Sequence, residues 1–192
     1  MKLTLRAGGI VRKGPERDLV DDYVKRANGL TNACGFHSVT EQQVDLRRDK
    51  TRSDETNSLL GNIPDAAVLV VLDEKGKALT SRKMAQFFDN QRRDGTPEIV
   101  IAIGGADGFE PENIPPGTHK WSFGIQTWPH KLVRVMMAEQ ALLFIDQASG
   151  ERVLQINNGS RYDQKISDGS FTLFTFSEHG IRVREHGAEF KQ

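Results

Sequence analysis

An apolar segment that runs directly into a glycine-rich turn is the feature that most restricts the fold of this chain. Residues 98–103 read EIVIAI, and GGADGF follows at 104–109. The apolar run is typical of a buried strand. Glycines directly after such a strand let the backbone approach a ligand closely, because no Cβ stands in the way. The two segments together predict a buried strand that ends at a ligand site.

A second apolar run, DAAVLVVLD at 65–73, is bounded by turn residues and has the pattern of a strand buried on both faces of a parallel sheet. Strands and helical patterns alternate up to residue 140. This alternation predicts an α/β fold, a mainly parallel sheet between helices.

The expected elements, in chain order, are a strand at 2–7, a helix from Pro15 to about Asn28, a strand at 37–46 and a polar helix ending near Gly61. They continue with the strand at 65–73, a helix capped by Ser81 and ended by Asp94-Gly95, the strand at 98–103, and a helix after Trp128-Pro129.

The ends of three strands are expected to meet at one edge of this sheet. One loop follows Leu72, a second begins at Gly104, and a third spans residues 123–128. Open α/β sheets usually bind ligands at such a place. The glycine cluster is neither a dinucleotide fingerprint nor a phosphate-binding loop of the Walker type, and taken alone such a cluster is more often only a tight turn.

Two residues after the third loop have more than one interpretation. His130 is either a helix-capping or packing residue or a group that acts on a ligand. Arg134 either holds a phosphate or carbonyl oxygen or pairs with Glu139. A basic run at 47–52, with Arg47, Arg48, Lys50 and Arg52, is a secondary candidate for RNA contact, although a solvated loop explains it as well.

The composition sets limits on compartment and partners. The 192 residues include 26 Lys and Arg and 26 Asp and Glu, which gives a formal net charge of zero. Net charge therefore favours binding neither to nucleic acid nor to a membrane. The single cysteine, Cys34, indicates a reducing compartment, and the Cys and His spacing suggests no metal site. No signal peptide or segment of eighteen apolar residues is present, so we expect a cytoplasmic protein without a membrane anchor.

The hydrophobic pattern of the sequence changes after residue 140, where helical periodicity gives way to short alternating segments. Short alternating pieces such as SFTLFTFSEHGIRVRE, with hairpin residues in NNGS (157–160) and SEHG (177–180), predict antiparallel strands. We therefore expect a first domain at 1–145 and a β-rich appendage at 146–192.

Residues 1 to about 140 resemble a known family, the small SPOUT methyltransferases that modify a pseudouridine at N3 in 23S ribosomal RNA of the bacterial large subunit. The resemblance rests on VVLDEKGKALTS at 70–81, VIAIGGADGF at 100–109 and SFGIQTWPHKLVRVMMAEQ at 122–140, together with the MKLTL start. It implies a SPOUT α/β knot with a trefoil-knotted region, a homodimer, S-adenosyl-L-methionine as methyl donor, and the assembled ribosome as substrate. It implies neither a membrane nor a metal partner.

The resemblance also implies a set of site residues. His130 and Arg134 are the expected RNA contacts, and the residue that removes the N3 proton is left open. The cofactor contacts carried over position by position are Leu72, Gly104, Phe123, Gly124, Ile125, Gln126, Thr127 and Trp128.

The chain departs from the family after Gln140. Family members continue with a Tyr-Arg-Ala segment and finish with Gly-His-Pro-Tyr-His-Arg, whereas this chain reads ALLFID at 141–146 and then 46 further residues. Residues 150–185 weakly resemble part of the periplasmic domain of a lipopolysaccharide-export permease. Two alternatives to an active enzyme follow: a catalytically impaired remnant that still binds cofactor or ribosome, and a chain whose tail prevents the knot or the dimer.

Overall fold

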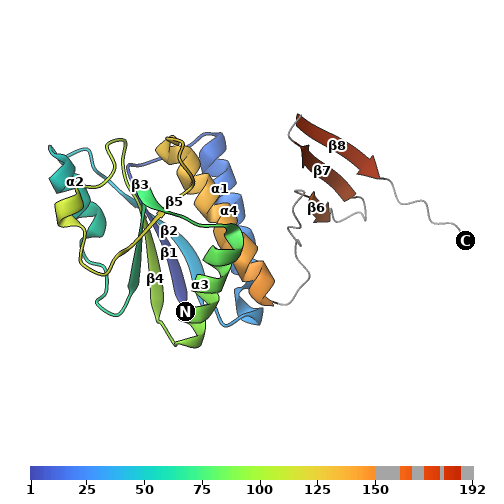
Figure 1. Cartoon of the computed structure of the whole chain (residues 1–192), viewed down its shortest axis with the longest axis horizontal. Helices are drawn as coiled ribbons and strands as arrows, with labels where there is room; N and C mark the ends of the chain where they lie inside the picture. Colours follow the sequence, from blue (N-terminus) through green and yellow to red (C-terminus); the bar gives the residue numbers. More distant parts are fainter. Residues whose placement is uncertain (150–160, 166–170, 178–179, 187–192) are drawn as a thin grey trace, which may run out of the picture. The chain divides into compact units, whose positions relative to one another are not determined.

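A five-stranded parallel sheet lies at the centre of the larger part of the chain (Figure 1). The computed structural model describes residues 1–149, 161–165, 171–177 and 180–186, and the chain divides into two units, Met1–Glu151 and Arg152–Gln192. The strands are β1 (Lys2–Gly8), β2 (Ser38–Val44), β3 (Val68–Ala78), β4 (Glu98–Ile103) and β5 (His119–Ser122), in the order β2-β1-β4-β3-β5. All neighbours are parallel, which confirms the predicted α/β sheet.

Strand β4 lies between β1 and β3. Its residue Ile101 is in register with Leu5 of β1 and Val70 of β3. All its residues from Ile99 to Ile103 are buried, because helices cover both faces of the sheet. The unbroken apolar run at 98–103 is the direct consequence of this central position.

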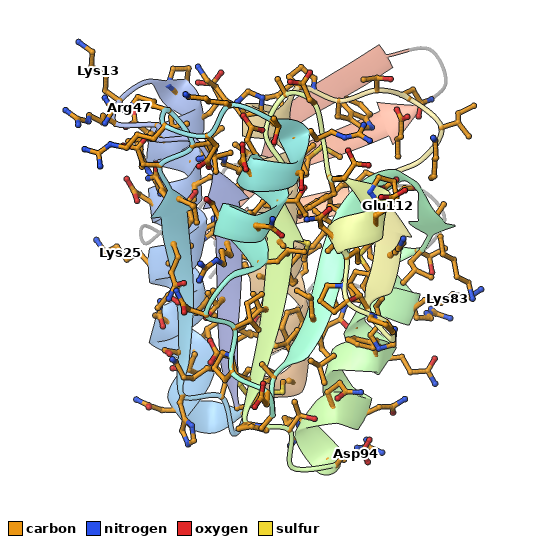
Figure 2. The ribbon with its side chains drawn as sticks, turned by 90° about the vertical axis from the view of Figure 1, so that its left-hand side faces the viewer. Lys13, Lys25, Arg47, Lys83, Asp94 and Glu112 are labelled. Atoms are coloured by element: carbon orange, nitrogen blue, oxygen red, sulfur yellow. The ribbon has the colours of Figure 1, made fainter. Side chains whose placement is uncertain are left out.

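The helices form the outer two layers around the sheet (Figure 1). Helices α1 (Pro15–Leu30), α3 (Ser81–Arg93) and α4 (His130–Ser149) cover one face, and α2 (Arg52–Leu60) covers the other with the short turn η2 (Pro111–Asn113). A second short turn, η1 (Thr31–Ala33), follows α1. Figure 2 views the sheet from the α2 side, with charged side chains such as Lys25 and Lys83 directed outward.

Two element boundaries differ from the sequence prediction. Helix α3 is capped by Thr80, whose hydroxyl accepts a hydrogen bond from the Lys83 amide at 3.3 Å, so Ser81 is the first helical residue and not the cap. Both residues are good caps, and only the extended backbone of Thr80 decides between them. Strand β3 continues to Ala78, five residues beyond the predicted end at Asp73.

Helix α4 continues through residues 146–149, which the sequence analysis assigned to the appendage. In the second unit, the strands β6 (Arg161–Lys165), β7 (Phe171–Ser177) and β8 (Gly180–His186) form an antiparallel sheet, as the alternating pattern predicted. Ser177 pairs with Gly180 across the predicted SEHG turn. The other predicted turn, NNGS at 157–160, lies outside the described residues.

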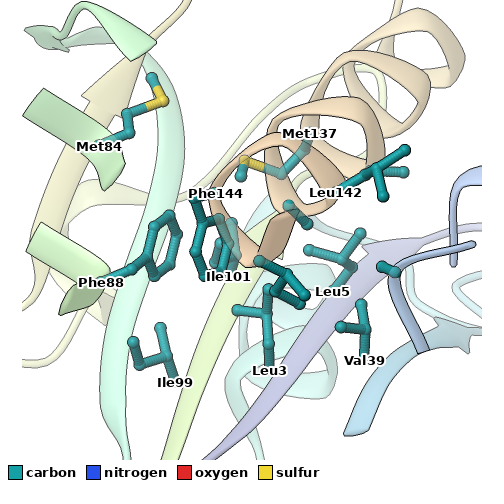
Figure 3. Close-up of a cluster of buried hydrophobic side chains, with 14 of the residues drawn as sticks. Leu3, Leu5, Val39, Met84, Phe88, Ile99, Ile101, Met137, Leu142 and Phe144 are labelled. Atoms are coloured by element: carbon teal, nitrogen blue, oxygen red, sulfur yellow. The ribbon is translucent and has the colours of Figure 1, made fainter. Parts of the chain in front are cut away.

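Phe144 joins α4 to the rest of the core (Figure 3). Its ring stacks on Phe88 of α3 with centroids 4.0 Å apart and an interplanar angle of 11°, and it meets Phe36 edge-on at 5.3 Å. Phe144 is buried, and it packs in one cluster with Leu3 and Ile101 of the sheet. The residues that follow position 140 therefore contribute to the core of the first unit.

We expect Phe144→Ala to lower the free energy of unfolding of the first unit by about 3–5 kcal/mol, because the substitution removes a buried aromatic ring and leaves a cavity. Urea unfolding followed by circular dichroism measures the change. Gln147→Ala, at an exposed position on the same helix, is the matched control and should change it by less than about 1 kcal/mol. A Phe144→Ala effect as small as the control would contradict the packing described.

Candidate functional site

Three loops at one edge of the sheet surround a pocket of about 390 Å³. Parallel strands bring their carboxyl ends to the same edge, so segments far apart in sequence meet there. The pocket is lined by the segments that follow β4 and β5 and by the outer part of β3. The predicted cofactor residues that line it are Leu72, Gly104, Phe123, Gly124, Gln126, Thr127 and Trp128. Ile125 does not line it, and its side chain is 98% exposed.

An irregularity in β3 forms the first wall. Strand β3 pairs with β5 up to Leu72, and the register then shifts so that pairing resumes at Lys77. The intervening residues leave the ladder and border the pocket: Asp73, Glu74 and Lys75. Gly76 permits this shift, because a Cβ there would lie 2.5 Å from the backbone carbon of Trp121. The sequence prediction placed a loop after Leu72 at this site, but it missed that the strand resumes at Lys77, because the polar residues suggested that the strand had ended.

The glycine loop after β4 forms the second wall and is also a tight turn. The Gly108 amide donates to the Gly105 carbonyl at 3.3 Å, and Gly108 adopts a φ of +71° that favours glycine. A Cβ on Gly104 would lie 3.0 Å from Gly108 Cα and 3.1 Å from its carbonyl carbon, so the Gly108 backbone would have to shift by a few tenths of an ångström. The two interpretations of this motif are therefore compatible, since the turn itself is the pocket wall.

The loop at 123–128 forms the third wall and is held by its own hydrogen bonds. The Trp128 indole Nε1 donates to the Phe123 carbonyl at 3.3 Å, and the Gly124 amide donates to Ser122 Oγ at 3.4 Å. Gly124 has a φ of +111°, which explains the glycine at this position. Pro129 then begins α4 by accepting the amide of Val133 at 3.1 Å.

His130, the first residue of α4, lines the pocket and is half-buried. Burial lowers the pKa of its imidazole below the ordinary value of 6.5, and the positive charges of Arg134 and Lys131 lower this pKa further. The imidazole is therefore mainly neutral at pH 7. A neutral imidazole can accept a hydrogen bond or a proton, which the charged form cannot.

Arg134 is buried beneath the pocket edge and not open to solvent. Its Nη2 donates to the carbonyl oxygens of Gly8 and of Gly9, the latter at 2.9 Å. Its Nη1 lies 3.7 Å from Glu41, whose other carboxylate oxygen pairs with Arg17. The predicted pairing of Arg134 with Glu139 is not formed. Arg134 therefore links α4 to the end of β1. To contact RNA, its guanidinium would have to release these two carbonyl oxygens.

The basic run of the β2–α2 loop is partly neutralised. Arg52 donates twice to the Glu110 carboxylate, at 3.0 and 3.1 Å, and Arg47 pairs with Asp45 at 2.5 Å. Within the described part of the chain, no group of three or more His, Cys, Asp or Glu side chains could hold a metal ion. None of the helices in that part combines the length and hydrophobicity needed to cross a bilayer.

Comparison with known protein families shows which family the chain belongs to. Residues 1–162 match the family described as "Predicted SPOUT methyltransferase". The chain belongs to the SPOUT methyltransferases. Among curated relatives, the ribosomal RNA large subunit methyltransferase H of Maricaulis maris is 44% identical over 140 residues, which cover 73% of this chain and 90% of the relative. The proteins of the same name from Hyphomonas neptunium and Cereibacter sphaeroides are 39% and 41% identical with the same coverage.

These identities assign this SPOUT methyltransferase to the ribosomal RNA large subunit methyltransferase H family, and they confirm the resemblance drawn from its motifs. Among solved structures, a methyltransferase of Legionella pneumophila in complex with S-adenosylmethionine covers 77% of this chain and 66% of its own, at 16% identity. Its TM-score of 0.38 is too low to support an argument.

We expect His130 to titrate with a midpoint below 6.5, because its partly buried ring lies near two cations. Proton NMR of the imidazole signals against pH measures this midpoint. Lys131→Gln should raise it by removing one of the two charges, whereas Lys83→Gln on α3 should leave it unchanged. A wild-type midpoint at or above 6.5 would contradict the environment described.

Proposed function

We propose that this chain uses S-adenosyl-L-methionine to methylate N3 of a pseudouridine in 23S ribosomal RNA within the assembled ribosome. One observation carries the proposal: every predicted cofactor residue except Ile125 lines a single pocket built from three separate strand ends. The curated relatives named above are ribosomal RNA large subunit methyltransferases, which gives the class of substrate. A ribosomal substrate would place the activity in the cytoplasm.

The pocket fits such a cofactor in size and chemistry. Its volume of about 390 Å³ lies in the range of small-molecule sites. Apolar walls from Leu72, Phe123 and Trp128 would cover an aromatic base, and the glycines leave backbone amides and carbonyls within reach. Asp73 and Glu74 bring negative charge to a site for a sulfonium. When bound, S-adenosylmethionine supplies a methyl group activated by positively charged sulfur.

The protein's own contribution would be positioning more than covalent chemistry. Methyl transfer needs the donor and the acceptor nitrogen in line, so a fixed pocket supplies much of the effect. The hydrogen bond from Trp128 to Phe123 keeps the third loop closed beside the glycine turn. His130, neutral at pH 7 and at the pocket wall, is the better placed of the two proposed RNA contacts, because Arg134 is engaged by Gly8 and Gly9.

We further propose that the chain forms the homodimer, with a trefoil knot, that the resemblance implies. Large apolar side chains are exposed on α1, on α4 and on the loop at 123–128. Among them are Leu19 of α1, Leu132 of α4 and Ile125 of the loop. A second copy would remove them from water. Light scattering should give the mass of two chains, and the mass of a single chain at micromolar concentration would contradict the dimer.

Methyl transfer from labelled S-adenosylmethionine to ribosomes lacking the modification tests the proposed activity. Reverse transcription should stop at one pseudouridine of 23S ribosomal RNA, because a methyl group at N3 blocks the base-pairing edge. Gly104→Ala should reduce the transfer at least tenfold and weaken cofactor binding, since its Cβ would displace the backbone of Gly108. Gly29→Ala, whose Cβ meets nothing within 4 Å, is the matched control and should be as active as the wild type.

Transfer at several unrelated positions, or none by wild-type protein, would contradict this activity. Cofactor and ribosome binding without transfer would support the alternative function, a binding remnant whose C-terminal segment departs from the family. Equal activity of Gly104→Ala and Gly29→Ala would contradict the cofactor site.

A further inference from the structure

A hollow with a basic lining lies at the same edge of the sheet as the pocket. Its volume is about 460 Å³, and three segments contribute to it: the loop after β1, the loop after β2 and the first turn of α4. The residues that line it are Ile10, Val11, Arg12, Lys13, Arg47 and Lys131. We call Arg12, Lys13 and Lys131 the basic rim. Figure 2 shows Lys13 and Arg47 close together at the upper edge of the sheet.

The basic rim carries uncompensated charge. Arg47 is the fourth cation of the hollow, and its hydrogen bonds hold the pKa of Asp45 at about 2, so this pair stays ionised and neutral overall. Arg12, Lys13 and Lys131 are exposed, and they form no ion pair within the portion of the chain that the structure describes. Three positive charges therefore remain around one hollow although the chain as a whole has a formal net charge of zero.

The basic rim adjoins the cofactor pocket through consecutive residues. His130 lines the pocket, and its neighbour Lys131 lines the hollow. Arg134, one turn further along α4, holds the carbonyl oxygens of Gly8 and Gly9 and so fixes the start of the loop that carries Arg12 and Lys13. The buried arginine thus ties both parts of the rim to one another and to the pocket edge.

Phosphate chemistry fits this arrangement better than a carboxylate or apolar partner does. Exposed cations spread over two segments suit a repeated negative charge, since each can meet a different phosphate without being desolvated. The pocket itself attracts phosphates less than the rim does, because its three carboxylates, Asp73, Glu74 and Asp107, outnumber its cations, Arg52 and Lys75, and Arg52 is paired with Glu110. A nucleic-acid strand whose base enters the pocket would therefore direct its backbone toward the basic rim.

We propose that the basic rim binds phosphates of the RNA backbone beside the target nucleotide. This inference rests on the proposed function for the identity of the RNA, whereas the contact itself is a property of the surface. The rim would supply affinity and orientation without reading sequence. Arg12, Lys13 and Lys131 are then RNA-binding residues beyond the site residues that the resemblance implies, and Arg134 is a positioning residue that acts through Gly8 and Gly9.

The test compares two triple variants that each remove one arginine and two lysines. The rim variant is Arg12→Gln with Lys13→Gln and Lys131→Gln. The control variant is Arg82→Gln with Lys83→Gln and Lys120→Gln, all exposed and outside the hollow. The probe is a fluorescent single-stranded RNA of twenty nucleotides, titrated at several salt concentrations, and calorimetry with S-adenosylmethionine checks that each variant keeps a folded pocket.

The rim variant should bind the RNA at least about tenfold more weakly at low salt, and the slope of log affinity against log salt should become shallower by about 2, since each phosphate contact on a single strand contributes about 0.7. The control variant should keep the wild-type slope, and both should keep the wild-type cofactor affinity. Equal losses in the two variants, no loss in the rim variant, or binding to anionic lipid vesicles without binding to RNA would overturn the proposal.

Methyl transfer by the same three proteins separates this inference from the proposed function. If RNA binding depends on the basic rim but the wild type transfers no methyl group, the proposed activity is contradicted and the proposed role of the rim is supported. If the wild type and the rim variant both methylate ribosomes with equal KM, the proposed activity is supported and the proposed role of the rim is contradicted.

Discussion

The two-sided burial of β4 between β1 and β3 is the constraint on which the other features depend. Residues Ile99–Ile103 can be buried on both faces only if helices cover the sheet above and below. Strand β4 pairs in parallel with β1 and β3, and β3 pairs in parallel with β5, so the ends of β4, β3 and β5 lie at one edge. The glycine turn after Ile103 consequently opens where the other two loops arrive, and the pocket is a consequence of the sheet order.

A buried ionic cluster links this sheet edge to α4. Arg134 of α4, Glu41 of β2 and Arg17 of α1 lie together, with Arg134 bonded to two backbone carbonyls at the end of β1. Taking these charges out of water is costly, and replacing such a cluster by apolar residues is often neutral or stabilising in other proteins. Its value here is positional, because it fixes the first turns of α4, and with them His130 and Lys131, against the loop after β1. The pocket and the basic rim therefore both depend on the contacts of Arg134.

The sequence allowed most of the first unit to be predicted, because burial patterns and turn residues carry that information locally. The apolar runs located β3 and β4, and the glycines after β4 located one pocket wall. The exact start of a helix was harder to predict from the sequence, because it depends on backbone geometry. Thr80 and Ser81 are both good helix caps, and only the fold selects Thr80. The irregular part of β3 was missed since DEKGK has a polar composition, although Gly76 was a usable signal.

Long-range partners were the least predictable features. Nothing in the local sequence indicated that Arg134 would bind Gly8 and Gly9, more than a hundred residues earlier, or that Arg12 and Lys131 would line one hollow. Ile125 was carried over with its motif, yet its side chain is directed to solvent. A motif located the loop, but only the three-dimensional structure distinguished the residues that line the pocket from one that does not.

In the proposed function, three segments that are separated in the sequence close around one cofactor. Hydrogen–deuterium exchange with and without S-adenosylhomocysteine tests it most directly, because the amides of each segment are followed by their own peptides. We expect slower exchange on ligand addition in residues 72–76, 103–109 and 122–130 together, with little change in α2 or at the C-terminal end of α3. Protection confined to one of these segments, or centred on another part of the chain, would contradict it.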